Sequence, residues 1–110
     1  MSSVIDLTIL DQLKDMLGDD FVLILESFRD EGSSIIQAIE SAASSSDMNQ
    51  MREAAHSMKS MSGNVGAMNL SELSDQLQIA AANSEAGQVH ALWPEVKSQF
   101  EQALEELESH

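Results

Sequence analysis

A histidine stands among small and basic side chains in the segment AAHSMKSMSGNVGA, which covers residues 54–67. If this segment is helical, Lys59 and Ser60 lie three and four residues after His56, and Arg52 lies four residues before it, so all three are its surface neighbours. A free imidazole titrates near pH ~6.5, so its neutral form offers a nucleophilic nitrogen at neutral pH. Attack on a phosphoryl group would leave a product with close to two negative charges, which Lys59 and Arg52 could stabilise through charge-assisted hydrogen bonds.

The helix that carries this histidine has a continuous apolar side. At about 100° per residue, the inward stripe consists of Met51, Ala55, Met58, Ser62 and Val65. His56 then lies well to the side of the core. Ser60 and Gly63 leave room for a second protein to bring an aspartate in line with His56. Phosphoryl transfer depends on this kind of positioning and on charge neutralisation more than on covalent machinery.

Helical periodicity extends over most of the chain, and strand patterns are almost absent. Helices are predicted from residue 6 to 17, from the aspartates at 19–20 to about 43, from 47 to 66, from 69 onward, and from about 85 to 107. The stripes outside the histidine helix are Leu10, Leu13 and Leu17; Phe21, Leu25, Phe28, Gly32, Ile35, Ile39 and Ala42; Leu70, Leu73, Leu77 and Ala80; and Val89, Trp93, Val96, Phe100, Ala103 and Leu107.

Several residues predict where the early helices begin and end. Gly18 ends the first helix, because glycine takes a positive φ without a Cβ penalty. Asp19 or Asp20 is expected to cap the second helix. Asp47, followed three residues later by Gln50, has the spacing of a capping box at the start of the third helix.

Three further positions carry structural predictions. Asn69 with Glu72 forms a weaker capping-box variant at the start of the fourth helix. Gly32 lies inside an apolar stripe, where it costs about 1 kcal/mol relative to alanine, so we expect a neighbouring helix to approach it closely. Pro94 removes one backbone donor, which predicts a kink in the last helix or, alternatively, the first turn of a separate helix.

Four long amphipathic helices with short connections favour one architecture. We predict an all-α, antiparallel up-down four-helix bundle with a short N-terminal helix capping one end. Its length of 110 residues predicts a single domain over residues 1–110.

The charge excludes some classes of partner. The chain has 19 acidic and 5 basic residues, for a formal net charge of -14, which disfavours binding to nucleic acid or to an anionic membrane surface. Residues 1–9 lack the pattern of a signal peptide, and no apolar run could span a bilayer. Cysteine is absent, so we expect a cytoplasmic protein without thiolate metal sites.

The histidine segment resembles the histidine-containing phosphotransfer (HPt) domains. Their pattern, His-x-Leu-Lys-Gly-x-Ser/Ala-x-x-hydrophobic-Gly-Ala, corresponds here to HSMKSMSGNVGA at residues 56–67. The opening segment IDLTILDQLKDMLGDDF and the spacing of the four long helices are also similar to that family. The sequence departs from the pattern at Ser60, where the family has glycine, and at Met58, where it has leucine. Serine is still small, so we expect partner access to survive.

The resemblance implies a role for each matching residue. His56 would accept the phosphoryl group on Nε2, Lys59 would hold the phosphate, and Gln78 would bond Nδ1 and leave Nε2 free. It also implies a monomeric carrier in a multistep two-component relay. The expected partners are response-regulator receiver domains and a hybrid sensor histidine kinase. No cofactor of its own is expected, with Mg²⁺ supplied by the receiver.

Other interpretations remain open at this point. The chain could be an acidic helical adaptor that binds receivers without carrying phosphate, or the substrate domain of a chemotaxis-type kinase. A lone Glu53-x-x-His56 element falls short of a bundle di-iron site, which needs two such elements, so no metal site is predicted. No nucleotide-binding motif occurs, so we expect no kinase activity. His90 and His110 are predicted to be solvated and non-catalytic.

Overall fold

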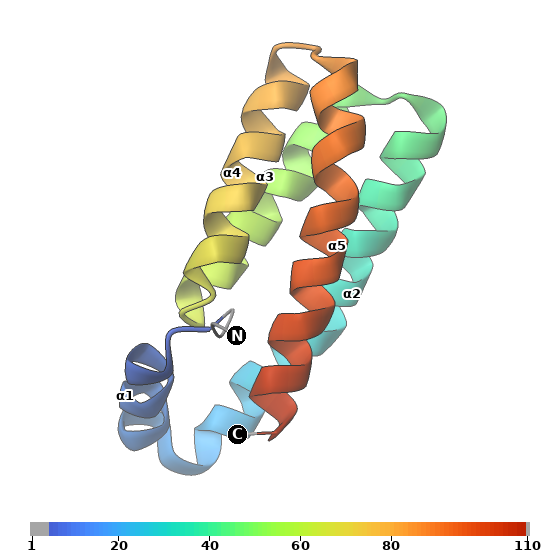
Figure 1. Cartoon of the computed structure of the whole chain (residues 1–110). Helices are drawn as coiled ribbons and strands as arrows, with labels where there is room; N and C mark the ends of the chain where they lie inside the picture. Colours follow the sequence, from blue (N-terminus) through green and yellow to red (C-terminus); the bar gives the residue numbers. More distant parts are fainter. Residues whose placement is uncertain (1–4, 110) are drawn as a thin grey trace.

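The computed structural model describes residues 5–109 and is built from α-helices joined by short turns (Figure 1). The elements in chain order are α1 (Leu7–Leu17), the 3₁₀ helix η1 (Gly18–Asp20), α2 (Phe21–Ser45), α3 (Met48–Asn64), α4 (Met68–Ala82) and α5 (Ala86–Ser109). Helix α3 packs against α2 and α4, and α5 closes the ring by packing against the same two helices. The predicted all-α four-helix bundle with a short N-terminal helix is therefore confirmed.

The N-terminal segment covers the end of the bundle where α3 turns into α4 (Figure 1). The backbone N–H of Asp6 donates to the carbonyl of Gly66 at 2.8 Å, and Ile5 and Leu10 are buried. Gly66 has φ +79°, and a Cβ placed there would lie 2.9 Å from Ile9 Cγ2. Only glycine combines that backbone conformation with so close a neighbour, so this turn fixes α1 to the end of the histidine helix.

Two of the predicted helix boundaries are confirmed in detail. Gly18 follows α1 with φ +55°, and its N–H donates to the carbonyl of Lys14. The Asp47 carboxylate accepts from the N–H of Gln50 at 3.0 Å at the start of α3. These contacts use the free backbone groups at helix ends, as capping requires.

Other boundary predictions were wrong. Neither aspartate of η1 caps α2 through its side chain, because the 3₁₀ turn runs directly into α2 and supplies backbone partners instead. Helix α4 begins at Met68, after Ala67 and without a side-chain cap, so Asn69 already lies inside the helix and cannot cap it. Pro94 lies within a continuous α5, which excludes the predicted alternative of a separate helix.

The core follows the predicted stripes with small rotations. Every member of the stripe on α3 is buried, from Met51 to Val65. On α2, Ile36 is buried in place of the predicted Ile35, which is half-buried. Leu25, Leu73 and Trp93 are also half-buried at the edges of their stripes.

Gly32 permits the close helix approach that the sequence predicted. A Cβ at this position would overlap the ring of Phe100 on α5. That ring is buried and lies against Phe28, with the two centroids 5.2 Å apart. The close contact between α2 and α5 therefore depends on a residue without a side chain at position 32.

Candidate functional site

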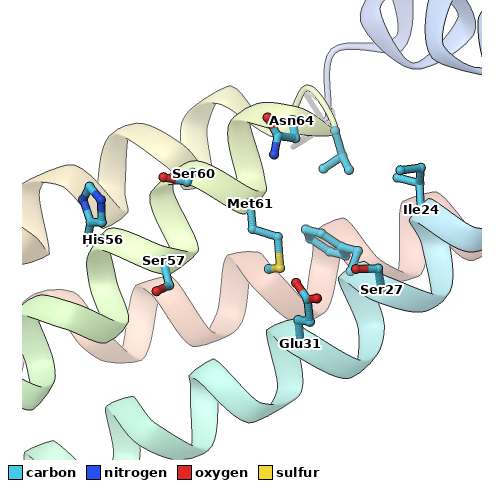
Figure 2. Close-up of a pocket in the computed structure, with 10 residues that line it drawn as sticks. Ile24, Ser27, Glu31, His56, Ser57, Ser60, Met61 and Asn64 are labelled. Atoms are coloured by element: carbon cyan, nitrogen blue, oxygen red, sulfur yellow. The ribbon is translucent and has the colours of Figure 1, made fainter.

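His56 lies on the solvent-exposed side of α3, about midway along the helix. Figure 2 shows its ring on the outer side of the helix, one turn before Ser60, while Ser57 and Met61 face α2. The buried stripe on the opposite side of α3 anchors the helix in the core. The backbone that carries His56 is thus fixed by packing while the imidazole stays open to solvent.

Two contacts define how α3 and α4 are aligned. Lys59 Nζ lies 3.0 Å from Asp75 Oδ1, and a Cβ on Gly63 would lie 3.7 Å from Ser71 Oγ. In an antiparallel pair, moving back along one helix corresponds to moving forward along the other. Four residues back from Gly63 is Lys59, and four on from Ser71 is Asp75, so the two contacts agree in register.

The same register places Gln78 opposite His56. His56 is three residues before Lys59, and Gln78 is three residues after Asp75. Both side chains line one surface depression, together with Arg52, Glu53 and Ser57. The structure therefore brings together three predicted site residues, His56, Gln78 and Arg52.

The side-chain amide of Gln78 has unused hydrogen-bonding capacity. Its Oε1 is buried and has no hydrogen-bond partner. A buried acceptor without a partner costs free energy, and the assignment of the amide oxygen and nitrogen rests on the surrounding network. An imidazole N–H from the facing helix would satisfy this oxygen.

Lys59 is already engaged, which the sequence analysis missed. Its ammonium group pairs with Asp75, and its backbone carbonyl accepts from Ser71 Oγ at 2.9 Å. It does not line the depression that His56 shares with Gln78. The sequence predicts only that Lys59 holds a phosphate on His56, and its ion pair with Asp75 becomes visible once α3 and α4 are aligned.

Arg52 differs from the other cations of the chain. Among the Lys and Arg side chains of residues 5–109, that of Arg52 alone has no ion pair or ring contact. An ion pair or ring contact is found for each of the others, which are Lys14, Arg29, Lys59 and Lys97. Arg52 is exposed and lines the same depression as His56. The guanidinium is therefore available to an anion at His56 without breaking an existing ion pair.

Ser60 and Gly63 occupy different surroundings. Ser60 is exposed and lines a second depression next to His56, between α2 and α3, whose α2 wall includes Ile24, Ser27, Phe28 and Glu31 (Figure 2). Gly63 is exposed but contributes to none of the depressions around His56; it faces Ser71 on α4 instead. The surface open to a partner at His56 is thus bordered by Ser60 more directly than by Gly63.

The structure describes one of the other two histidines. His90 is exposed on α5, while His110 lies outside the described residues. Within residues 5–109, no three His, Asp or Glu side chains gather as metal ligands would, and none of the helices is long and apolar enough to cross a bilayer.

Fold and site together define a class of protein: a four-helix bundle with an exposed histidine, beside a glutamine and an arginine without an ion pair, on a helix whose other side is buried in the core. Residues 23–110 match the family described as Hpt domain. The chain belongs to the Hpt domain family, whose members take part in histidine phosphotransfer within phosphorelays.

A solved structure supports the same fold. The crystal structure of histidine-containing phosphotransfer protein B (HptB) from Pseudomonas aeruginosa PAO1 is similar, with a TM-score of 0.92 and 22% sequence identity. The alignment covers 99% of this chain and 95% of that one. A search of curated proteins gave no significant match.

Proposed function

We propose that this chain is a phosphocarrier in which His56 receives a phosphoryl group from the aspartyl phosphate of one receiver domain and passes it to the aspartate of another. The observation that carries the proposal is the exposure of His56 on a helix whose other side is fully anchored in the core. Family membership supports a histidine phosphotransfer role.

The chemical step needs little from the carrier itself. Nε2 of the neutral imidazole attacks phosphorus, the N–P bond forms, and the bond between phosphorus and the aspartyl oxygen breaks with the carboxylate as leaving group. The return step reverses these changes on a second receiver. Gln78 supports this chemistry if its buried Oε1 accepts from Nδ1–H, because Nε2 then holds the free lone pair.

Charge neutralisation comes from the cations beside the ring. Arg52 lines the depression next to His56 and is not committed to an ion pair within residues 5–109, so it can donate to the phosphoryl oxygens directly. Lys59 lies one helical turn from His56 and contributes when it leaves Asp75. The receiver supplies Mg²⁺, and the carrier provides no ATP site or kinase activity of its own.

The surface around Ser60 provides the approach for the receiver. Ser60 is exposed, and the adjoining depression between α2 and α3 combines apolar side chains with Glu31. A receiver that places its aspartate over His56 would cover this depression. The two exposed serines at 57 and 60 keep the approach free of bulky side chains.

The proposal is tested by mixing the purified chain with a phosphorylated receiver domain and following loss of label from the receiver. We expect rapid transfer to the chain as an acid-labile phosphohistidine, and none in His56→Ala. His90→Ala is the matched control, since His90 is also exposed, and it should transfer normally. If His56→Gln still bound the receiver and wild-type chain acquired no label, the chain would be an adaptor and not a carrier.

A further inference from the structure

The lysine nearest His56 is held by a carboxylate on the neighbouring helix. Lys59 Nζ and Asp75 Oδ1 are 3.0 Å apart, and the two side chains are 43% and 39% exposed. Ion pairs this exposed are weak and exchange readily with other partners. Lys59 can therefore leave Asp75 when a stronger anion is placed beside it.

The position of this ion pair is fixed by the backbone. Ser71 Oγ donates to the carbonyl of Lys59, which joins the two helices one turn along α4 from Asp75. Lys59 Cα consequently stays in place when its side chain moves. Exchange of the ammonium group between two acceptors requires side-chain rotation only, with no shift of α3 against α4.

Phosphorylation of His56 would create the competing anion. His56 lies one helical turn before Lys59, and Asp75 lies one turn before Gln78, the residue opposite His56. A phosphoryl group carries close to two negative charges and would share the neighbourhood of one ammonium group with a carboxylate. The two anions then compete for Lys59 and also repel each other.

We propose, on the basis of the phosphocarrier function above, that Asp75 is a positioning residue that holds Lys59 away from His56 and thereby lowers the affinity of His56 for the phosphoryl group. Arg52 meets the incoming phosphoryl group first, and Lys59 adds its charge only by giving up Asp75. This competition keeps the phosphorylated chain ready to discharge to the next acceptor. No covalent bond to Asp75 is involved.

The test uses phosphoramidate as the phosphoryl donor, so that no receiver is needed. The transfer forms the N–P bond at His56 and releases ammonia, and added ammonium brings the reaction to equilibrium. Wild-type chain and Asp75→Asn are incubated in separate tubes of the same phosphoramidate and ammonium buffer, and the phosphorylated fraction of each is measured by intact-protein mass spectrometry, with the site mapped to His56. We expect the ratio of phosphorylated to free chain to be roughly twofold to fivefold higher in Asp75→Asn, the range for charge interactions between half-exposed groups.

Two variants separate this role from a general charge or folding effect. Asp75→Glu keeps the carboxylate and should restore the wild-type ratio. Glu40→Gln is the matched control, because Glu40 pairs with Lys97 at 3.2 Å with side chains 43% and 40% exposed, but between α2 and α5. It should leave the ratio unchanged.

A double-mutant cycle with Lys59→Met gives the decisive comparison. Most of the effect of Asp75→Asn should vanish once Lys59 is absent. An effect of equal size in both backgrounds, or no effect in either, would overturn the proposal. The outcome is independent of receiver transfer: a chain that phosphoramidate labels at His56 but that no receiver phosphorylates would contradict the phosphocarrier function while still testing Asp75.

Discussion

Ser60→Glu should block phosphorylation of His56 while leaving the bundle folded. Ser60 is exposed on α3, four residues after His56, so the two side chains are surface neighbours about 5–6 Å apart. A carboxylate at about 6 Å from a group with two negative charges costs roughly 1.4 kcal/mol at the dielectric constant of water. That energy corresponds to about a tenfold lower rate of transfer to His56. Crowding of the receiver by the longer side chain lowers the rate further.

The assay is the initial rate of transfer from a phosphorylated receiver, with helicity followed by circular dichroism. Ser60→Gln has nearly the shape of the glutamate without its charge, so it measures crowding alone. Ser60→Ala should transfer normally. The difference between glutamate and glutamine should shrink as salt is raised, because exposed charges are screened over about 8 Å at physiological ionic strength. Normal transfer by Ser60→Glu with normal helicity would refute the reasoning about access to His56.

Two further predictions concern the scaffold. Gly32→Ala should destabilise the bundle by about 1–2 kcal/mol, because the overlap of the new Cβ with the buried ring of Phe100 outweighs the gain in helix propensity. Urea unfolding measures this loss of stability, and an unchanged midpoint would show that the ring moves freely. Asp47→Ala should lower the stability of the bundle by about 1 kcal/mol, because it removes the cap on α3. Asn69→Ala should leave the stability nearly unchanged, because α4 lacks a side-chain cap. Thermal melts compare the two variants, and equal losses of stability would contradict the assignment of the caps.

The architecture was largely predictable from the sequence because apolar spacing fixes which side of each helix is buried. The α3 stripe, the end of α1 at Gly18 and the close approach at Gly32 follow from side-chain size and backbone freedom alone. The burial of Ile36 rather than Ile35 on α2 does not follow from these properties. Both isoleucines lie near the apolar stripe, and the packing of α3 and α5 against α2 decides which one is buried.

The grouping of the candidate site residues was predictable where these residues lie on one helix. The spacing of Arg52, Lys59 and Ser60 around His56 is a property of α3 alone. The engagement of Lys59 by Asp75 is a property of two helices and depends on their register, which the sequence does not encode in any single segment. That Arg52 alone among the cations of residues 5–109 forms no ion pair or ring contact is likewise evident only when the partners of the other cations are known.

Caps were predicted less reliably than stripes. An Asp or Asn three residues before a Gln or Glu is a local pattern, and the same pattern occurs at Asp47, which caps, and at Asn69, which lies inside α4. The turn at Gly66, held by the N-terminal segment, allows α4 to begin one residue earlier. Tertiary contacts therefore override the local signal at that boundary.

The central claim is that His56 carries the phosphoryl group, and the most direct measurement is the location of that group. The chain is incubated with a phosphorylated receiver, digested under mildly alkaline conditions that preserve phosphohistidine, and mapped by mass spectrometry. We expect the phosphoryl group on His56 and no labelling of the His56→Ala variant. A phosphoryl group on another residue, or undiminished labelling of His56→Ala, would contradict the account.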